Sequence, residues 1–387
     1  MGQGPLQGTK VVELGGMGPG PFAGMMLADM GAEVVRVDRP GGGGSGFPGD
    51  PREDLLNRGK RSVALDLKQP VAVDAVLTMA EQADVVIEGF RPGVAERLGI
   101  GPADCHGRNP RLVYGRMTGW GQEGPLALSA GHDVTYIAVT GVLHAIGEAG
   151  RPPQIPLNLV GDFGGGALYL VSGVLAALRE ADRTGRGQVV DAAMVDGAAH
   201  LLMGTHALFN AGAWIDQRAS NLLDGGAPFY STYATADGRH MAVGAIEPKF
   251  YADLVKRLGV DLDLSRQNDS EFWPAARASI AAAFASRTQA EWVAEFDGTD
   301  ACVAPILSLQ EAATGPHIAA RKTILSDGRR LEAAAAPRFS AHTWTGATRP
   351  PVPGEHTRET LTEWGIDVDA MFAAGAASDM TDRATVH

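Results

Sequence analysis

The sequence predicts an α/β protein with a parallel sheet in a large domain and a second, smaller α+β domain. Short β-branched runs alternate with helical patterns over the first 120 residues, which is typical of βαβ units. A hairpin pattern followed by helical stretches comes after residue 220, where the composition changes. The length of 387 residues fits two or three domains.

The first predicted strands are nearly continuous apolar runs, as expected for parallel strands that are covered on both faces. They lie at 10–14, 33–38, 62–67, 83–88 and 112–117, and a helix is predicted over 21–30. The Gly- and Pro-rich segment 39–52 interrupts this pattern and predicts a mobile surface loop. A buried apolar helix is expected over 164–178, a sixth strand over 188–193 and a long helix over 194–214.

These patterns divide the chain into a large domain over 1–220, a small α+β domain over 225–320 and a return segment over 321–387. The small domain begins with a hairpin over 232–246, whose turn is Asp237-Gly238. A Pro-rich connection covers 336–356, and a last helix is predicted near 358–374. The tail from about residue 375 is predicted to be disordered.

Composition excludes several classes of protein. The net charge of −12, from 45 acidic and 33 basic side chains, argues against general nucleic-acid binding. Cys105 and Cys302 show neither CxxC nor Cys/His spacing, so neither a disulfide framework nor a structural metal site is expected. No apolar run reaches about 18 residues and no signal-peptide pattern opens the chain, so we expect a cytoplasmic protein without a membrane span.

A glycine cluster at 15–20 follows the first strand, and Asp38 ends the second. This arrangement is close to a dinucleotide-binding fingerprint, in which pyrophosphate binds at a helix N-terminus. Pro19 and Pro21 remove two of the backbone donors that such a site uses. We therefore do not favour NAD binding, and a Gly-rich turn in an α/β domain explains the same residues.

Basic residues gather after the second strand and before the third, which is notable in an acidic chain. They are Arg39, Arg58, Lys60 and Arg61, and Arg91 follows the fourth strand. Ligands of open α/β sheets bind outside the carboxyl ends of the strands, so this set favours a phosphate-rich cofactor or substrate. A solvated basic face is the alternative.

Asp162 lies in the segment NLVGDFGGG at 158–166, just before the apolar helix. Aspartate is a favoured N-cap, and capping is one interpretation. However, three consecutive glycines destabilise a helix, which indicates that something approaches the backbone closely. Free N–H groups at a helix start would also stabilise an oxyanion.

His132 lies in the segment Gly131-His132-Asp133, and Glu247 ends the predicted hairpin. Histidine is the side chain best suited to proton transfer near neutral pH, and a carboxylate such as Glu247 could orient it. Taken alone, His132 could be structural and Glu247 an exposed loop acid. Asp133 is a candidate to support His132 or Asp162, or it is a structural turn residue.

The chain resembles the family III CoA-transferases and, within them, the racemase branch. The resemblance rests on several segments between residue 11 and about residue 250, among them DVVIEGFRPGVAERLG, RMTGWGQEGP, AGHDVTYIAVTG, NLVGDFGGG, GQVVDAAMVDG and LLDGGAPFYSTY. It implies a Rossmann-like large domain, a small domain and an interlocked homodimer. It also implies that CoA lies on the large domain, with Arg39, Arg58 and Arg91 as contacts.

The resemblance further implies the chemistry. In the racemase branch the histidine of the GHD motif, His132 here, and the motif aspartate, Asp162, carry protons on opposite faces of an acyl-CoA α-carbon. Glu247 would reach His132 from the neighbouring subunit. We expect a cofactor-independent racemase of (2R)- and (2S)-2-methylacyl-CoA thioesters that works through an enolate, with His132 on the (S)-face and Asp162 on the (R)-face. CoA is then part of the substrate.

Two alternatives stay open. One is a CoA-transferase of the same fold that uses Asp162 as a nucleophile, and the other is a non-catalytic acyl-CoA-binding protein. His132 separates the racemase hypothesis from the CoA-transferase hypothesis, because a transferase has no stated need for a base at that position.

Overall fold

The computed structural model describes residues 4–41 and 48–379. Its contacts divide the chain into two compact units. The first unit comprises Met1–Thr140, Leu157–Leu201 and Glu332–His387, and the second comprises Gly141–Pro156 and Leu202–Leu331. Compared with the small domain predicted over 225–320, the second unit also takes in residues 141–156 and 202–224. The return segment predicted from residue 321 begins at Glu332.

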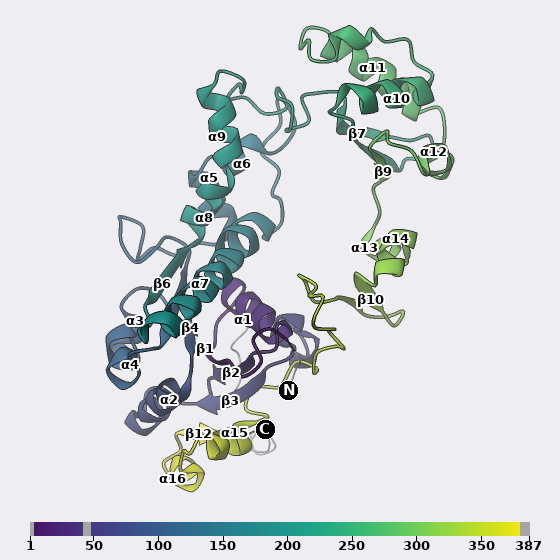
Figure 1. Ribbon diagram of the computed structural model, residues 1–387. Coiled ribbons are helices and arrows are strands. Elements are labelled where there is room, and N and C mark those ends of the chain that lie inside the picture. Colours follow the sequence, from purple (N-terminus) through teal and green to yellow (C-terminus); the bar gives the residue numbers. More distant parts are fainter. Residues whose placement is uncertain (1–3, 42–47, 380–387) are drawn as a thin grey trace. The chain divides into compact units, whose positions relative to one another are not determined.

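Within the described residues, the first unit is built on a seven-stranded sheet in the order β12-β3-β2-β1-β4-β5-β6 (Figure 1). The pairs are parallel except that β12 runs antiparallel to β3. The bounds are β1 Lys10–Leu14, β2 Glu33–Asp38, β3 Arg61–Leu65, β4 Val85–Glu88, β5 Val113–Thr118, β6 Val189–Ala193 and β12 Ala377–Ser378. The six strands predicted before residue 200 are therefore confirmed, with ends that differ by at most two residues.

The order of the strands reverses at β1. The chain proceeds from β1 to β2 and β3 on one side and later to β4, β5 and β6 on the other. Val12 on β1 accordingly lies between Val35 on β2 and Val86 on β4. Ligands of open parallel sheets bind outside the carboxyl ends of the strands at such a switch point, so the segments that follow β1 and β4 are the place to look for a site.

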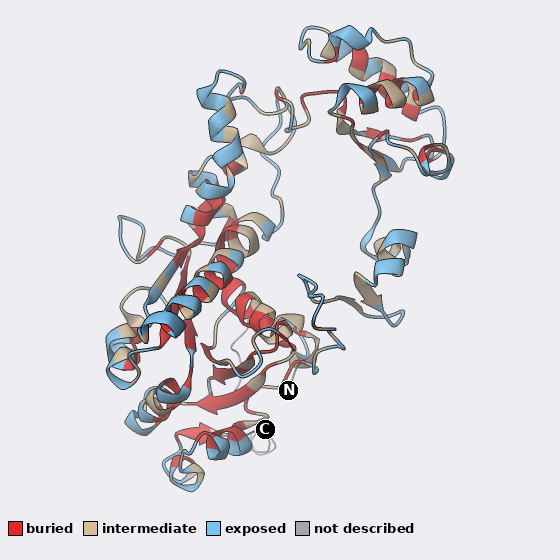
Figure 2. Cartoon of the chain, viewed as in Figure 1, coloured by how far each residue is buried: buried red, intermediate tan, exposed pale blue. Residues whose placement is uncertain are grey.

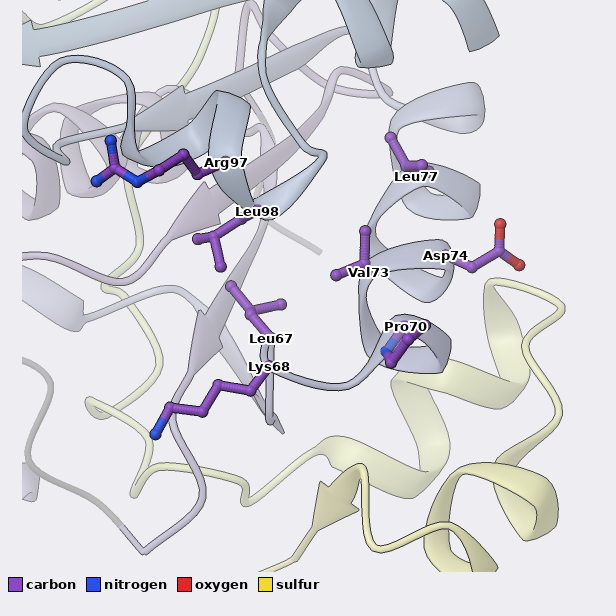
Figure 3. A pocket seen from close by; sticks show the side chains of 8 residues that line it. All are labelled: Leu67, Lys68, Pro70, Val73, Asp74, Leu77, Arg97 and Leu98. Atoms are coloured by element: carbon purple, nitrogen blue, oxygen red, sulfur yellow. The ribbon is translucent and has the colours of Figure 1, made fainter.

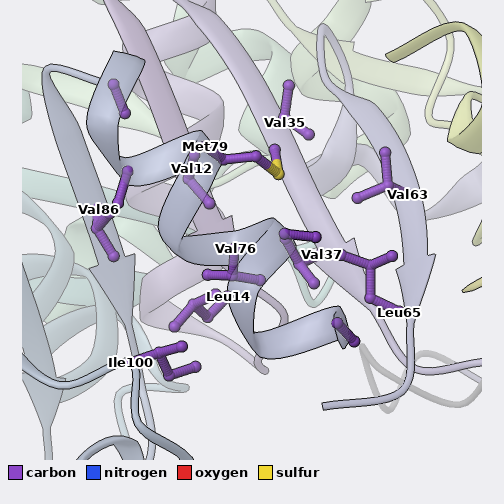
Figure 4. Close-up of a cluster of buried hydrophobic side chains, with 14 of the residues drawn as sticks. Val12, Leu14, Val35, Val37, Val63, Leu65, Val76, Met79, Val86 and Ile100 are labelled. Atoms are coloured by element: carbon purple, nitrogen blue, oxygen red, sulfur yellow. The ribbon is translucent and has the colours of Figure 1, made fainter. Parts of the chain in front are cut away.

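Helices cover both faces of this sheet, whose strands are largely buried (Figure 2). Val12 packs with Val76 and Met79 in one core cluster, shown in Figure 4, while Val11 packs with Leu170 in a second cluster. Successive strand residues point to opposite faces, so the two clusters lie on opposite sides of the sheet. The first cluster involves α2 (Pro70–Gln82), α15 (Thr357–Glu363) and α16 (Val368–Ala373), and the second involves α1 (Pro19–Asp29) and α7 (Leu168–Thr184).

The glycine-rich segment before α7 is a π-helical turn, η3 (Leu159–Ala167), and the whole helical run is longer than the predicted 164–178. Its N-cap residue is Asn158, so Asp162 lies inside the segment and the capping interpretation of Asp162 is wrong. A Cβ on Gly165 would lie 2.6 Å from the backbone nitrogen of Ala198, and one on Gly197 would lie 1.8 Å from the carbonyl oxygen of Gly165. The glycines thus allow η3 to cross α8 (Met194–Leu201) at backbone contact.

The run Leu159–Thr184 contains an 18-residue window of mean hydropathy 1.5, so by length and composition alone it could cross a membrane. This corrects the expectation that no such segment exists. Leu170 and Val174 of this run pack in the core beneath the sheet, and a buried core helix has the same composition as a membrane span. Only 39% of the window is buried, so an apolar face of the run is exposed within its own chain.

The helix predicted over 194–214 is two helices, α8 and α9 (Met203–Asn210). They are separated at Leu202, where the helical backbone is interrupted and the second unit begins. The helix predicted over 358–374 is likewise divided into α15 and α16, because Gly365 adopts φ 72° after the first of them.

Two predictions of disorder need correction. Ala377 and Ser378 pair with Leu65 and Ala64 as β12, so the predicted disorder from residue 375 is wrong at this strand, and 380–387 lie outside the described residues. Of the predicted mobile loop 39–52, residues 42–47 lie outside the described residues. Its end, Pro51–Glu53, is a short 3₁₀ turn that is capped by Asp50.

The second unit contains the predicted hairpin, formed by β7 (Tyr230–Ala234) and β8 (His240–Gly244). Gly238 has φ 74° in its turn, which confirms the Asp-Gly turn prediction. A core that includes Phe229, Phe284 and Trp292 holds the helices against this sheet. The other bounds in this unit are α6 Val142–Ala145, β9 Val303–Pro305, α10 Pro248–Leu258, α11 Trp273–Phe284, α12 Gln289–Phe296, α13 Leu309–Thr314, α14 Pro316–Arg321, β10 Ile324–Ser326 and β11 Leu331–Ala333, the last of which extends into the first unit.

Candidate active site

A cavity of about 420 Å³ lies at the carboxyl ends of β1, β4 and β5, at the switch point of the sheet. Segments that follow these strands line it, at 16–21, 89–92 and 119–120. The loop before α5 (Asp133–Val139), α5 itself and η3 add further lining residues, among them His132, Tyr136 and Asp162. All of these residues belong to the first unit.

Three of the residues predicted from the sequence line this cavity: Arg91, His132 and Asp162. The histidine and the aspartate are 30 positions apart in the sequence, and the fold brings them to one space. Arg39 and Arg58 are not among the lining residues, and Glu247 belongs to the second unit. The proposed acid–base pair and one of the proposed CoA contacts therefore share a site.

Asp162 is held on two sides. Its backbone N–H donates to Oδ2 of Asp133 over 2.7 Å, and its own Oδ2 accepts from Nδ2 of Asn158 over 3.1 Å. Burial raises the pKa of the Asp162 carboxyl, and the Asp133 carboxylate acts in the same direction, while Asn158 and His132 oppose the rise. A carboxyl whose pKa is raised towards neutrality is better suited to exchange a proton with a weakly acidic carbon.

The segment after β1 approaches the same carboxylate. Gly18 has φ 69°, and a Cβ at this position would lie 3.3 Å from Oδ2 of Asp162. Glycine at position 18 thus satisfies both the left-handed backbone and the close contact. This is a role for the glycine cluster that does not require a dinucleotide.

His132 precedes α5, and its side chain is exposed at the cavity. Its backbone N–H donates to Oγ1 of Thr135 over 3.0 Å, and its carbonyl oxygen accepts from the Thr135 hydroxyl over 2.7 Å. These bonds fix the backbone from which the imidazole projects. Both side chains line the cavity, and His132 opposes the rise in the pKa of Asp162.

Tyr136 is a lining residue that the sequence analysis did not identify. Its ring meets Trp120 edge-on, with a centroid distance of 4.8 Å, and a Cβ on Gly119 would lie 2.1 Å from the Tyr136 ring. Burial raises the pKa of Tyr136, and so does Asp162, whereas Arg91 lowers it. The charges of Asp162 and Arg91, which line the same cavity, thus act on the pKa of this hydroxyl in opposite directions.

The fold divides the basic set that the sequence analysis grouped together. Arg58 is buried, and its guanidinium donates to Asp29 over 2.5 Å and to Glu332 over 2.8 Å. Lys60 is buried against Glu13, and the Arg61 guanidinium pairs with Glu33 and Glu363. Arg58, Lys60 and Arg61 are therefore paired within the protein and do not form one exposed basic cluster. Spacing in the sequence could not show these carboxylates as their partners.

Asp38 is also engaged within the protein. It is 3% exposed, and its carboxylate accepts from Arg36 over 2.5 Å and from the Ser62 hydroxyl over 2.6 Å. An aspartate bound in this way does not present the free carboxylate that a dinucleotide-binding fingerprint uses for a ribose hydroxyl.

Glu247 is exposed at the start of α10, where it is the N-cap residue without a side-chain capping bond. Its negative charge helps to raise the pKa of the Cys302 thiol, although burial is the larger cause. The carboxylate is thus accessible, and its proposed contact with His132 of a second copy stays a prediction.

A second depression of about 570 Å³ lies on the surface of the first unit, beside the start of α2 (Figure 3). Leu67, Val73, Leu77 and Leu98 form its apolar wall, and none of the predicted site residues lines it. Among the described residues, no group of three or more His, Cys, Asp or Glu is placed to hold a metal ion. The predicted acid–base residues His132 and Asp162 line the cavity at the switch point instead.

The sequence also matches a known protein family. The sequence model that describes the CoA-transferase family III matches residues 6–357 of this chain. Since this covers most of the 387 residues, the chain belongs to that family. The fold class predicted from the sequence is confirmed by this match and by the solved structures described next.

Solved structures of the family share the fold. A CAIB/BAIF family protein from Brucella suis aligns over 93% of this chain and 99% of its own, with a TM-score of 0.77 and 26% identity. A protein of Mycobacterium tuberculosis aligns over 92% and 99%, with a TM-score of 0.76 and 30% identity.

Two sequence relatives are much more similar. The chain is 48% identical over 370 residues to "Alpha-methylacyl-CoA racemase" of Mus musculus and 45% identical over 380 residues to the protein of that name from Homo sapiens. Each alignment covers 95% of both chains. By contrast, "Succinyl-CoA--D-citramalate CoA-transferase" of Chloroflexus aurantiacus is 31% identical over 388 residues, covering 93% of this chain and 94% of the relative.

Proposed function

We propose that this protein interconverts (2R)- and (2S)-2-methylacyl-CoA thioesters by proton transfer at the α-carbon. The observation that carries the proposal is that His132 and Asp162 line one cavity at the switch point of the sheet. The similarity to two racemases over nearly the whole chain supports the same reaction.

The reaction needs two proton carriers. A thioester makes its α-proton acidic because the negative charge left behind is delocalised into an enolate. One base removes the proton from one face, and an acid returns a proton to the other face of the planar intermediate, which inverts the centre. We assign His132 to the proton of the (S)-substrate and Asp162 to that of the (R)-substrate, so each enantiomer is deprotonated by one group and reprotonated by the other.

The enolate oxygen also needs a donor. The sequence analysis placed that donor in the backbone at the start of the glycine-rich segment. The N–H of Asp162 is already taken by Asp133, so this particular donor is unavailable to the oxyanion. In our proposal the oxyanion is held by other donors at the cavity.

The substrate brings CoA with it, and we propose no further cofactor. We propose Arg91, which lines the cavity, and Arg39, which is exposed after β2, as contacts of the CoA phosphate groups. Arg58 stays in the proposal as a third contact, although its guanidinium has protein partners here. We also propose a cytoplasmic location, on the basis of composition.

We propose a homodimer in which Glu247 of one copy supports His132 of the other. Large apolar side chains are exposed on the first unit around η3: Val139 is 63% exposed, Leu157 71%, Leu159 55% and Leu201 51%. Exposed apolar groups gathered in this way are typical of an interface. A second copy would bury them and supply the carboxylate.

One experiment tests the function. A single enantiomer of a 2-methylacyl-CoA is incubated with the protein in deuterated water. Racemisation predicts deuterium at the α-carbon together with loss of optical purity. The alternative, a CoA-transferase with Asp162 as nucleophile, predicts neither, but gives a new thioester with an acceptor acid and an anhydride that hydroxylamine traps. His132→Ala should slow racemisation strongly, because one of the two proton carriers is lost, and should leave CoA affinity near normal. An unchanged rate would exclude His132 from the mechanism.

A further inference from the structure

A charged cluster lies buried beneath the first turn of α1, next to the cavity but outside its lining. The ammonium of Lys60 is fully buried and forms an ion pair with Oε2 of Glu13 at 2.7 Å. It also donates to the carbonyl oxygen of Pro21 over 2.9 Å and to Oδ1 of Asn57 over 3.1 Å. Asn57 is held in turn by Asp54, over 2.7 Å.

Burial of an ammonium is unfavourable, and it lowers the pKa of Lys60, while Glu13 opposes this effect. The ammonium donates two hydrogen bonds, to Pro21 and Asn57, and Glu13 balances its charge at 2.7 Å without accepting a hydrogen bond from it. Apolar side chains of similar volume often stabilise a core as well as a buried ion pair does. Stability alone therefore does not explain why charge is placed here, and the geometry of what the charge holds is the better explanation.

The cluster holds the first turn of α1. Pro21, whose carbonyl oxygen Lys60 binds, lies in that turn and also lines the cavity. One turn further, a Cβ on Gly24 would lie 1.9 Å from Oε2 of Glu13. The helix thus rests directly on the ion pair, with no side chain between them.

The first turn of α1 in turn contacts the segment that carries Asp162. The ring of Phe22 stacks on the ring of Phe163, with centroids 4.5 Å apart and planes inclined by 23°. Gly18, just before α1, approaches Oδ2 of Asp162 as described above. Residues on both sides of Pro21 therefore touch Asp162 or its neighbour.

We propose that Lys60, paired with Glu13, is a positioning residue that fixes the first turn of α1 and thereby the place of the Asp162 carboxylate. This inference rests on the proposed function, in which Asp162 serves one enantiomer and His132 the other. His132 belongs to α5 and the loop before it, which the cluster does not touch. Loss of the cluster should therefore affect the two enantiomers unequally.

The test is Lys60→Met, measured as exchange of the α-proton for deuterium from each enantiomer separately. Displacement of a catalytic group by about 1 Å can slow a reaction about 10²-fold, so exchange from the (R)-substrate should fall by that order. Exchange from the (S)-substrate, which begins at His132, should change by only a few-fold and should proceed without racemisation. The KM for both substrates should stay near that of the wild type.

Two control variants separate positioning from loss of stability. Lys68→Met makes the same change at an exposed lysine away from the cavity and should leave both exchange rates unaltered. Val76→Ala removes core volume on the opposite face of the sheet, so it should lower the melting temperature without selecting between enantiomers. Equal loss of both exchanges in Lys60→Met would overturn the proposal, as would wild-type rates for both.

A second variant keeps the test decisive if Lys60→Met does not fold because a carboxylate is left buried. The pair Lys60→Met with Glu13→Gln removes both charges and still lacks the contact with Pro21. It should fold and retain the selective loss of (R)-exchange, and full recovery would overturn the proposal. Phe22→Leu, which removes the stack on Phe163, should show the same selectivity by a smaller factor. If the wild type itself exchanges neither enantiomer, the proposed function fails, and this outcome is distinct from a failure of the positioning role.

Discussion

The backbone N–H of Asp162 donates a 2.7 Å hydrogen bond to Oδ2 of Asp133, so the Asp133 carboxylate is bound to the main chain of the residue that lines the cavity. Asp133 is 5% exposed, and its Oδ1 has no hydrogen-bond partner among the described residues. Two neighbouring carboxylates disfavour each other's ionisation. Asp133 thus both holds the main chain of Asp162 and raises the pKa of its side chain.

Asp133→Asn should shift the pH profile of the reaction to lower pH. The asparagine can still accept the Asp162 N–H, but it removes the negative charge that helps to raise the pKa of Asp162. For the enantiomer that Asp162 deprotonates, the rate falls as pH drops through the pKa of Asp162. A lower pKa therefore moves the acidic limb of the profile to lower pH. The measurement is kcat/KM against pH for the (R)-substrate, and a limb that stays in place would remove Asp133 from this role.

Asn158→Ala should shift the same limb in the opposite direction. The amide of Asn158 donates to Oδ2 of Asp162 and lowers its pKa by stabilising the charged form. Without this bond the carboxylate is harder to ionise, and the acidic limb moves to higher pH. The double variant with Asp133→Asn should show a shift between those of the single variants, and two shifts of equal sign would contradict the electrostatic account.

Gly18→Ala should reduce activity far more than Gly20→Ala. Gly18 combines φ 69° with close contact to Asp162, whereas a Cβ on Gly20 meets nothing within 4 Å. A left-handed backbone costs an alanine roughly 1–2 kcal/mol, and the methyl group would also displace the carboxylate. Thermal unfolding and α-proton exchange of the two variants, measured side by side, test this expectation. Similar losses in both would show that the glycines serve the turn as a whole.

The sheet could be predicted from the sequence because each parallel strand is a local apolar run bounded by Gly, Pro or charged residues. For the site, the sequence placed Asp162 just before the apolar helix and His132 in the segment Gly131-His132-Asp133, and the pairing of the two followed from the family resemblance. The sequence could not show that Lys60 pairs with Glu13 or that Arg58 pairs with Asp29, because these pairs form only when distant segments meet. The basic set consequently looked more exposed in the sequence than it is.

The glycine-rich segment shows where local patterns are insufficient. Its three glycines correctly indicated a close approach to the backbone, but the approaching group is α8, through Gly197, and Asp162 is not a cap. Asn158 lies four residues before Asp162, a helical spacing at which side chains meet, and it could have been found from that spacing. Tyr136 offered no comparable local pattern, because the space for its ring is made by Gly119 and Gly131.

Gly165→Ala should destabilise the first unit. The added methyl group would lie 2.6 Å from the backbone nitrogen of Ala198, so η3 and α8 would have to separate. Overpacking of this kind costs about 1–3 kcal/mol. Gly107→Ala, in the exposed helix α4 (Pro102–Arg108), is the matched control, since its Cβ meets nothing within 4 Å and alanine favours the helix by up to about 1 kcal/mol. Chemical unfolding should give changes of opposite sign, and equal changes would refute the packing argument.

Mixing two inactive variants should restore activity if Glu247 acts across a homodimer. The His132→Ala chain lacks the histidine but keeps Glu247. The Glu247→Ala chain lacks the glutamate but keeps His132. A mixed dimer then contains one site with neither residue and one site with both, so refolding or co-expressing the two chains should recover part of the wild-type racemisation. Each variant refolded alone should stay inactive, because both of its sites lack the same residue. No recovery in mixed dimers, verified by separately tagged chains, would show that Glu247 acts within its own chain or not at all.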